Sequence, residues 1–252
     1  MTRAILAIAI AIAFRLFTSA SHTDAHRAAA DDILSRSIAA YSALKSYADT
    51  GAIVNEFAAN ASHRHTFTTY YRAPRQYYFE FVADQRAGAV RTVMWCDGGD
   101  FQSWSSGLGL HETYPRGSNT VLSGFAAAAG PTHRTISLIT GLLFANSGLL
   151  STVLEFGEDY TVDGTEDVGG HRCHKLVGMA RSMYAKTQRV TNVRRTVIWI
   201  DTESLLVRKV FEDTPEGSPL TAVNRTTVTL DPRANPTLED ARFTYTVPAP
   251  KR

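Results

Sequence analysis

The sequence predicts an α+β protein with one curved antiparallel β-sheet, an incomplete barrel, covered by an N-terminal helix and a central helical lid. Three observations lead to this prediction. An amphipathic stretch opens the predicted mature chain, short runs rich in aromatic and β-branched residues follow it, and a nearly uncharged stretch at residues 118–154 interrupts those runs. Because single strands and helices do not alternate, a parallel doubly wound sheet is disfavoured.

The first twenty residues have the three-part layout of a secretory signal peptide. Arg3 is followed by an apolar run from Ala4 to Phe14 and by small residues that end at Ala20. About 11 apolar residues are too few for a bilayer core that needs roughly 20, so cleavage is favoured over the alternative of a membrane anchor. We expect cleavage after Ala20 or as late as Ala25, and then a protein that is periplasmic or otherwise exported and is soluble as a single domain over residues 26–252.

The predicted mature domain is electrically balanced. The whole chain has 26 Lys and Arg, and removing the two arginines of residues 1–20 leaves 24 against 24 Asp and Glu. Nucleic acids are held mainly through many phosphate contacts from a cationic face. Nucleic acid is therefore not expected as a partner.

The first predicted element is a helix over residues 29–47. Asp31 and Asp32 lie near its start, where the helix dipole favours negative charge. Its apolar residues recur at three- and four-residue spacing and form one stripe. They are Ile33, Leu34, Ile38, Tyr41, Leu44 and Tyr47.

Strands follow the helix, and turn residues such as Asn60-Ala61-Ser62 separate them. Their order favours antiparallel hairpins in a meander. The first group is expected at residues 51–57, 65–71, 76–82 and 90–96. After the apolar stretch, strands are expected around residue 160 and at 171–178, 193–201, 206–213, 222–230 and 242–247.

One predicted strand face is wholly aromatic. Alternation along residues 76–82 places Tyr77, Phe79 and Phe81 together and sends Tyr78 and Glu80 to the other side. The cover expected for this face is the first helix with the helices predicted at 118–154. A curved sheet under such a cover can leave an apolar cavity for a ligand, and an ordinary packed core is the alternative.

Six sequence segments, in order, resemble the LolA/LolB-like lipoprotein carrier superfamily of the bacterial cell envelope, including the N-terminal domain of the RseB/MucB sensors. They extend through nearly the whole mature chain. They are Tyr41–Tyr47, Phe67–Pro74 with Tyr77–Glu80, Trp95–Gly98 with Trp104, Gly170–Leu176, Trp199–Asp201 with Leu205–Lys209, and Asn235–Pro248.

The resemblance implies an incomplete antiparallel barrel closed by a helical lid over an apolar cavity that receives acyl chains. Carriers of this kind often have Arg-Pro in the second strand pair, where the arginine helps to hold the lid. Here Ala73 precedes Pro74, so Arg72 takes that role only if a bulge restores its direction. The candidate cavity and lid residues are Phe67, Tyr77, Phe79, Phe81, Trp95, Phe125, Ile139, Leu142, Leu143 and Trp199.

The two cysteines, Cys96 and Cys173, both lie in predicted strands. In an oxidising compartment they are candidates for one disulfide, and two buried free thiols are the alternative. A metal site is not expected, because His171 and Cys173 would share a strand face but give only two of the four ligands that zinc prefers. We expect no cofactor.

The expected function is a binding or carrier protein for lipid or for the acyl chains of a lipoprotein. The partner is then a lipid or an acylated protein. Alternatives are an envelope sensor or regulatory module that contacts a membrane protein through the same pocket, or an enzyme adapted on this fold. No G-x-S-x-G sequence or Ser, His and Asp constellation stands out, so an enzyme is not the prediction.

Overall fold

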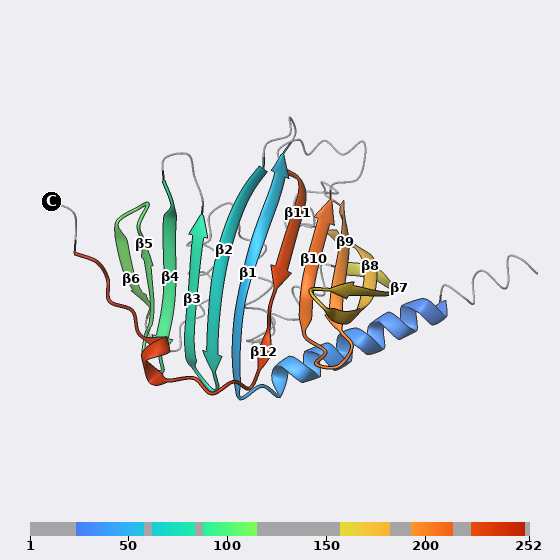
Figure 1. Ribbon diagram of the computed structural model, residues 1–252, viewed down its shortest axis with the longest axis horizontal. Helices are drawn as coiled ribbons and strands as arrows, with labels where there is room; N and C mark the ends of the chain where they lie inside the picture. Colours follow the sequence, from blue (N-terminus) through green and yellow to red (C-terminus); the bar gives the residue numbers. More distant parts are fainter. Residues whose placement is uncertain are drawn as a thin grey trace, which may run out of the picture.

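The computed structural model describes residues 24–57, 62–83, 88–114, 157–181, 193–213 and 223–249. The predicted signal peptide and the predicted lid at 118–154 lie outside these ranges. Most of the described chain belongs to one large twisted sheet (Figure 1). Its strands are β1 (Ser46–Phe57), β2 (Ser62–Arg72), β3 (Gln76–Ala83), β4 (Val90–Asp97), β5 (Phe101–Ser105), β6 (Leu110–Tyr114), β7 (Gly157–Val168), β8 (His171–Arg181), β9 (Val193–Asp201), β10 (Val207–Asp213), β11 (Val223–Leu230) and β12 (Arg233–Ala234).

Two meanders make up this sheet. Strands β1 to β6 follow one another on one side, β7 to β11 on the other, and the antiparallel pairing of β1 with β11 joins the two halves. The two-residue strand β12 adds a short pairing to the start of β1. Within the described residues β6 and β7 are the two edges, so the sheet does not close. The predicted curved, incomplete antiparallel barrel is confirmed.

Side chains alternate between two faces of the sheet, as the strand period requires. We call the face that carries Phe67 and Phe79 the inner face and the opposite one the outer face. Strand β3 is a clear example, with Tyr77, Phe79 and Phe81 buried on the inner face and Glu80 on the outer face. The main hydrophobic core lies on the inner face and draws side chains from both meanders.

One helix, residues 24–42, packs on this face beside β1 and the β7–β10 half of the sheet (Figure 1). Its predicted apolar stripe is present, and Ile33 and Tyr41 are buried. The helix ends before the predicted residue 47 because Asn235 accepts hydrogen bonds from the backbone amides of Lys45 (2.7 Å) and Ser46 (3.3 Å). These contacts turn the chain into β1.

Two further elements differ from the sequence prediction. The hairpin of β5 and β6 was not predicted, and the strand predicted at 242–247 is wrong. That stretch instead contains the 3₁₀ helix η3 (Asp240–Phe243) followed by irregular chain. Phe243, Tyr245 and Val247 are still more buried than the residues between them, so the alternation that resembles a strand comes from a segment lying flat on the sheet.

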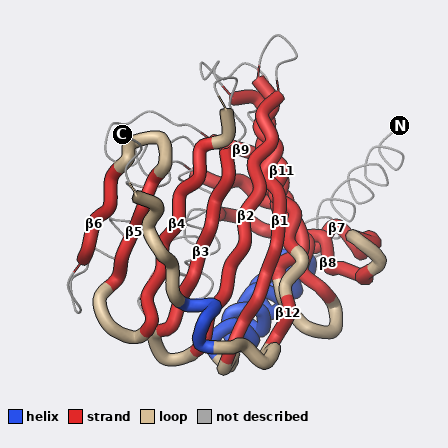
Figure 2. The backbone as a smooth tube through the Cα atoms, turned by 60° about the vertical axis from the view of Figure 1, so that its left-hand side comes forward, coloured by secondary structure: helices blue, strands red, loops and turns tan. Residues whose placement is uncertain are grey.

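This C-terminal segment, residues 235–249, crosses the outer face of β2 to β5 (Figure 2). The Tyr245 ring lies 5.3 Å from Trp95 and 5.7 Å from Trp104, measured between ring centroids. Phe243 is fully buried. The outer face of this half of the sheet is therefore covered by the chain's own end.

Arg72 holds this segment in place. The pairing of β2 with β1 and β3 is regular through Arg72, so no bulge turns its side chain to the inner face. Its guanidinium instead donates to the carbonyl oxygen of Leu238 (2.9 Å), pairs with Asp240 and lies 4.9 Å from the centroid of the Phe243 ring. In this geometry Arg72 orders the C-terminal segment. The role in holding a lid, which the resemblance implied, required a bulge that turns this side chain to the inner face, and β2 has no bulge there.

Replacing Arg72 by alanine is expected to loosen the C-terminal segment. The change removes a hydrogen bond, a partly exposed ion pair and a cation–π contact, which together are worth about 1–2 kcal/mol. We expect faster proteolysis within residues 235–249 and altered tryptophan fluorescence from Trp95 and Trp104. Arg75→Ala, an exposed arginine three positions away, is the control. Equal proteolysis of the two variants would show that Arg72 does not hold the segment.

Candidate functional site

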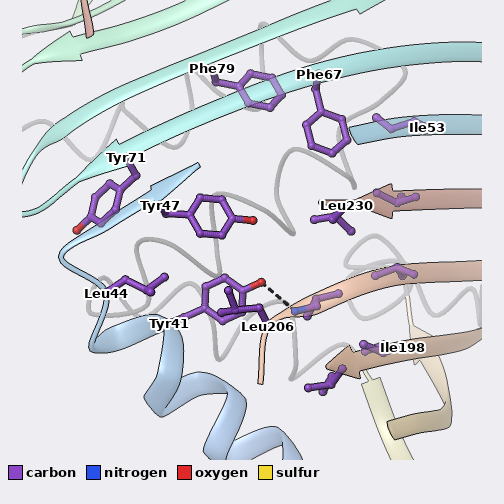
Figure 3. Packing of buried hydrophobic residues seen from close by; sticks show 14 of the residues in the cluster. Tyr41, Leu44, Tyr47, Ile53, Phe67, Tyr71, Phe79, Ile198, Leu206 and Leu230 are labelled. Atoms are coloured by element: carbon purple, nitrogen blue, oxygen red, sulfur yellow. Dashed lines mark hydrogen bonds between the residues drawn. The ribbon is translucent and has the colours of Figure 1, made fainter. Parts of the chain in front are cut away.

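An aromatic layer lines the inner face of β2 and β3. The rings of Phe67 and Phe79 stack with their centroids 6.1 Å apart and their planes 20° apart. Phe81 extends the layer and lies 5.3 Å from the His65 ring. These side chains are at most 5% exposed, and Figure 3 shows the rings of Phe67 and Phe79 side by side, with Ile53 next to Phe67.

Gly51 on β1 makes room for this layer. A Cβ atom at position 51 would lie 2.1 Å from the Phe67 ring and 2.3 Å from the carbonyl oxygen of Thr229. Only a residue without a side chain therefore lets the Phe67 ring lie across the neighbouring strand. The position of the ring thus depends on a glycine that the hydrophobic pattern alone does not single out.

The described helix is fixed to the other half of the sheet. Ser37 Oγ donates to the carbonyl oxygen of Leu205 (2.8 Å), and Tyr41 accepts a hydrogen bond from the amide of Val207 (3.1 Å), as the dashed line in Figure 3 marks. Nearer its start, Arg27 pairs with Asp159 of β7. The aromatic layer on β2 and β3 is thus displaced from the contacts that hold the helix.

A buried acid interrupts the apolar inner face. Asp49 on β1 is 0% exposed; its carboxylate accepts a hydrogen bond from the Tyr47 hydroxyl (3.0 Å) and one from the amide of Asp231 (2.9 Å). Removal from water raises the pKa of the Asp49 carboxyl to about 7, although the two hydrogen bonds act in the opposite direction. Asp49 therefore changes charge close to neutral pH.

A buried hydroxyl lies directly across from this acid. Thr69 on β2 is the cross-strand partner of Asp49 and is also 0% exposed. Among the described residues the Thr69 hydroxyl has no hydrogen-bond partner. Leaving a buried hydroxyl unpaired costs roughly 1–3 kcal/mol, so this pair of polar groups is unusual within an apolar layer.

The structure divides the predicted cavity residues into three groups. Phe67, Tyr77, Phe79 and Phe81 come together in the inner core. Trp95 and Trp199 lie on the outer face, where Trp95 contacts Tyr245 and Trp199 packs with Lys209, whose amine is 4.4 Å from the ring centroid. The third group, Phe125, Ile139, Leu142 and Leu143, lies outside the described residues.

The two cysteines do not pair. Both thiols are free and buried. Cys96 belongs to the inner core and Cys173 to a small outer cluster with Val197 and Trp199. Six strands separate the strands that hold the two cysteines. The predicted candidate disulfide is therefore not formed, and the alternative of two buried thiols describes the structure.

The polar residues around Cys173 form a structural cluster. Arg208 is 7% exposed and donates through Nε to Asp201 Oδ2 (3.1 Å), and His171 Nδ1 lies 3.1 Å from the same oxygen. Burial raises the pKa of the Cys173 thiol to about 11, so it stays protonated and is a poor nucleophile at neutral pH. Nowhere in the described ranges do three His, Cys, Asp or Glu side chains come close enough to share a metal ion.

Sequence reasoning found the aromatic layer but missed Asp49, Thr69 and Gly51. Tyr47, Asp49, Gly51 and Ile53 are alternate residues of β1, so they share one face of the strand. Because Tyr47 and Ile53 are on the inner face, Asp49 and Gly51 are on it too. That signal was available in the pattern. The pairing of Asp49 with Thr69 was not, because it depends on the register between two strands.

No family model matches the chain, and no curated protein is similar enough to count as a match. Among the described residues, no helix is both long and apolar enough to cross a membrane.

Solved structures do resemble the chain, and they include members of the superfamily that the sequence resembles. The lipoprotein LppX of Mycobacterium tuberculosis is 14% identical with a TM-score of 0.46, and the match covers 83% of this chain and 98% of LppX. A LolA superfamily protein from Nitrosomonas europaea is 12% identical with a TM-score of 0.33, covering 85% and 97% of the two chains.

The complex of MucA and MucB from Pseudomonas aeruginosa gives a third match, 14% identical with a TM-score of 0.44 over 85% of this chain. The present chain spans 60% of that matched chain. The three matches have 14% identity or less and TM-scores of 0.46 or less, so they are a likeness of fold alone.

Proposed function

We propose that this protein binds the hydrocarbon chain of a lipid, or of an acylated protein, against the inner face of its sheet. The observation that supports the proposal best is the aromatic layer on β2 and β3, which is displaced from the contacts of the described helix. In this proposal the apolar segment 118–154, with Phe125, Ile139, Leu142 and Leu143, covers the bound chain. Trp95 and Trp199 take no part, because they lie on the outer face.

The physical basis of such binding is burial of apolar surface. Each buried CH₂ group contributes roughly 0.8 kcal/mol, so affinity rises with chain length and depends little on the chain's exact structure. Aromatic rings provide large apolar surfaces at a low cost in side-chain entropy. The protein then acts as a carrier or receptor for exported lipid in the cell envelope, in keeping with the predicted signal peptide.

A matched pair of substitutions tests the role of the inner face. Phe67→Asp places a charge in the aromatic layer, whereas Thr66→Asp places the same charge on the exposed outer face one residue earlier. We expect delipidated wild type and the Thr66 variant to bind a fluorescent, uncharged hydrocarbon-chain probe with similar Kd, and the Phe67 variant to lose binding. Circular dichroism checks that each variant is folded.

A milder variant keeps the test informative if Phe67→Asp does not fold. Phe67→Leu keeps the face apolar but removes the ring, and we expect the probe to bind about 5–10-fold more weakly, which corresponds to roughly 1–1.4 kcal/mol. Binding that is unchanged in both Phe67 variants, or no probe binding by the delipidated wild type, would contradict the proposed function.

A further inference from the structure

Two polar groups lie side by side within the apolar inner face. Asp49 and Thr69 are direct cross-strand partners on β1 and β2, in the non-polar setting formed by Phe67 and Phe79. Both polar side chains are 0% exposed. A protein core normally pairs such groups or replaces them with apolar ones, so their presence calls for a physical reason.

The hydrogen-bonding capacity of the two side chains is only partly used. The Asp49 carboxylate has about four acceptor positions, and the described contacts fill two, from the Tyr47 hydroxyl and the Asp231 amide. The Thr69 hydroxyl can donate one hydrogen bond and accept others, and among the described residues it finds no partner. The Asp49 carboxylate therefore offers a strong acceptor, and the Thr69 hydroxyl offers an unused donor and an unused acceptor.

We propose that Asp49 and Thr69 form a polar recognition point for a hydroxyl group on the bound hydrocarbon. The hydroxyl of the ligand donates to the Asp49 carboxylate and accepts from the Thr69 hydroxyl. This inference rests on the proposed function and makes it more specific, because it names a long-chain alcohol or a hydroxyl-bearing acyl chain as the preferred ligand.

Other head groups fit less well. A fatty-acid carboxylate brings a negative charge next to Asp49, and two carboxylates in one apolar site repel each other. An ether or a methyl ester can accept from Thr69 but has no proton to donate to Asp49. Only a group that donates and accepts satisfies both side chains, and an unsatisfied buried polar group is the main source of such discrimination.

Tyr47 fixes the acceptor in place. Its hydroxyl donates to Asp49 Oδ2, and its ring lies 6.0 Å from the ring of Tyr41 on the helix, measured between centroids. The amide of Asp231 holds the other oxygen. The carboxyl group is therefore held by two separate parts of the chain and does not need to reorganise when a ligand hydroxyl arrives.

The test compares three probes of equal chain length on the delipidated full-length protein: a long-chain 1-alkanol, its methyl ether and the corresponding fatty acid. Each competes with a bound fluorescent apolar probe. We expect wild type to prefer the alkanol over the methyl ether by about tenfold, the ratio that one well-formed hydrogen bond gives. The fatty acid is expected to bind more weakly than the alkanol at pH 8.

The variants identify the two groups. Thr69→Val keeps the shape of the side chain but removes the hydroxyl, and Asp49→Asn replaces the charged acceptor; each is expected to reduce the preference for the alkanol to about twofold or less. Thr68→Val makes the same change one residue away, on the outer face, and is expected to keep the full preference. Thermal unfolding shows whether each variant is folded.

Two results overturn the inference while leaving the proposed function intact. One is equal affinity of wild type for alkanol and methyl ether although the apolar probe binds. The other is an alkanol preference that survives in both Thr69→Val and Asp49→Asn, in which case an internal water satisfies these side chains or the hydroxyl is bound elsewhere. If wild type does not bind the apolar probe at all, the proposed function itself fails.

Discussion

Replacing Gly51 by alanine is expected to be among the most destabilising single-methyl changes in this protein. The added Cβ atom would lie 2.1 Å from the Phe67 ring and 2.3 Å from the backbone oxygen of Thr229. The ring can move only by leaving the aromatic layer, and the oxygen belongs to the ladder of β1 and β11. We expect a loss of about 3 kcal/mol or more and a fall in Tm of roughly 6–12 °C.

The control is Gly99→Ala in the exposed turn after β4. A Cβ atom there meets only the Asp97 side chain, at 3.2 Å, and we expect a change in the free energy of unfolding within about 0.5 kcal/mol. The double variant Gly51→Ala with Phe67→Leu separates the two clashes. It is expected to recover only part of the loss, because the Thr229 oxygen stays in place; full recovery would show that the backbone contact is unimportant.

The meander was predictable because each half-buried strand has its own period-two pattern. The Gln76–Ala83 strand alternates strictly, and its observed bounds differ from the prediction by one residue. The hairpin of β5 and β6 has a weaker pattern: all of β6 except Tyr114 is exposed, so only Tyr114 marks its inward side. Strands that bury little leave little trace in a hydrophobic pattern.

Longer-range contacts set the limits of the prediction. Residue 47 continues the helical spacing of the apolar stripe, yet Tyr47 belongs to β1 because Asn235, far along the chain, ends the helix. The outer-face positions of Trp95 and Trp199 follow from strand parity, but whether a face is a cavity wall or a covered surface depends on the C-terminal segment and on register. Periodicity does not contain that information.

The same reasoning applies to the polar pair of the inner face. Asp49 falls between the predicted helix, which ends at residue 47, and the predicted strand, which begins at residue 51, and an aspartate there is most simply interpreted as a turn residue. The proposed role of this pair in ligand recognition depends on the register that sets Asp49 opposite Thr69 and on the depth at which both lie. Sequence reasoning could therefore predict the apolar inner face, but not the buried polar pair within it.

Titration of Asp49 is expected to make the protein less stable as the pH rises from about 4 to about 7. The pKa of this carboxyl is raised from 3.8 to about 7 in the folded state, chiefly by removal from water. Below pH 4 both states carry the proton. Between pH 4 and 7 the unfolded chain ionises while the folded protein stays protonated, so stability falls by up to about 1.4 kcal/mol per pH unit for this group.

Asp49→Asn removes this titration, and the measurement is the free energy of unfolding by urea at intervals from pH 4 to pH 8. We expect the difference between variant and wild type to rise in favour of the variant through this window and to level off above pH 7. Asp31→Asn, at an exposed aspartate of the helix, is the control. A flat difference for Asp49→Asn would mean that the folded protein ionises this carboxyl as readily as the unfolded chain. Asp49 would then be a carboxylate throughout this range, and recognition of a ligand hydroxyl would rest on its charged form at every pH tested.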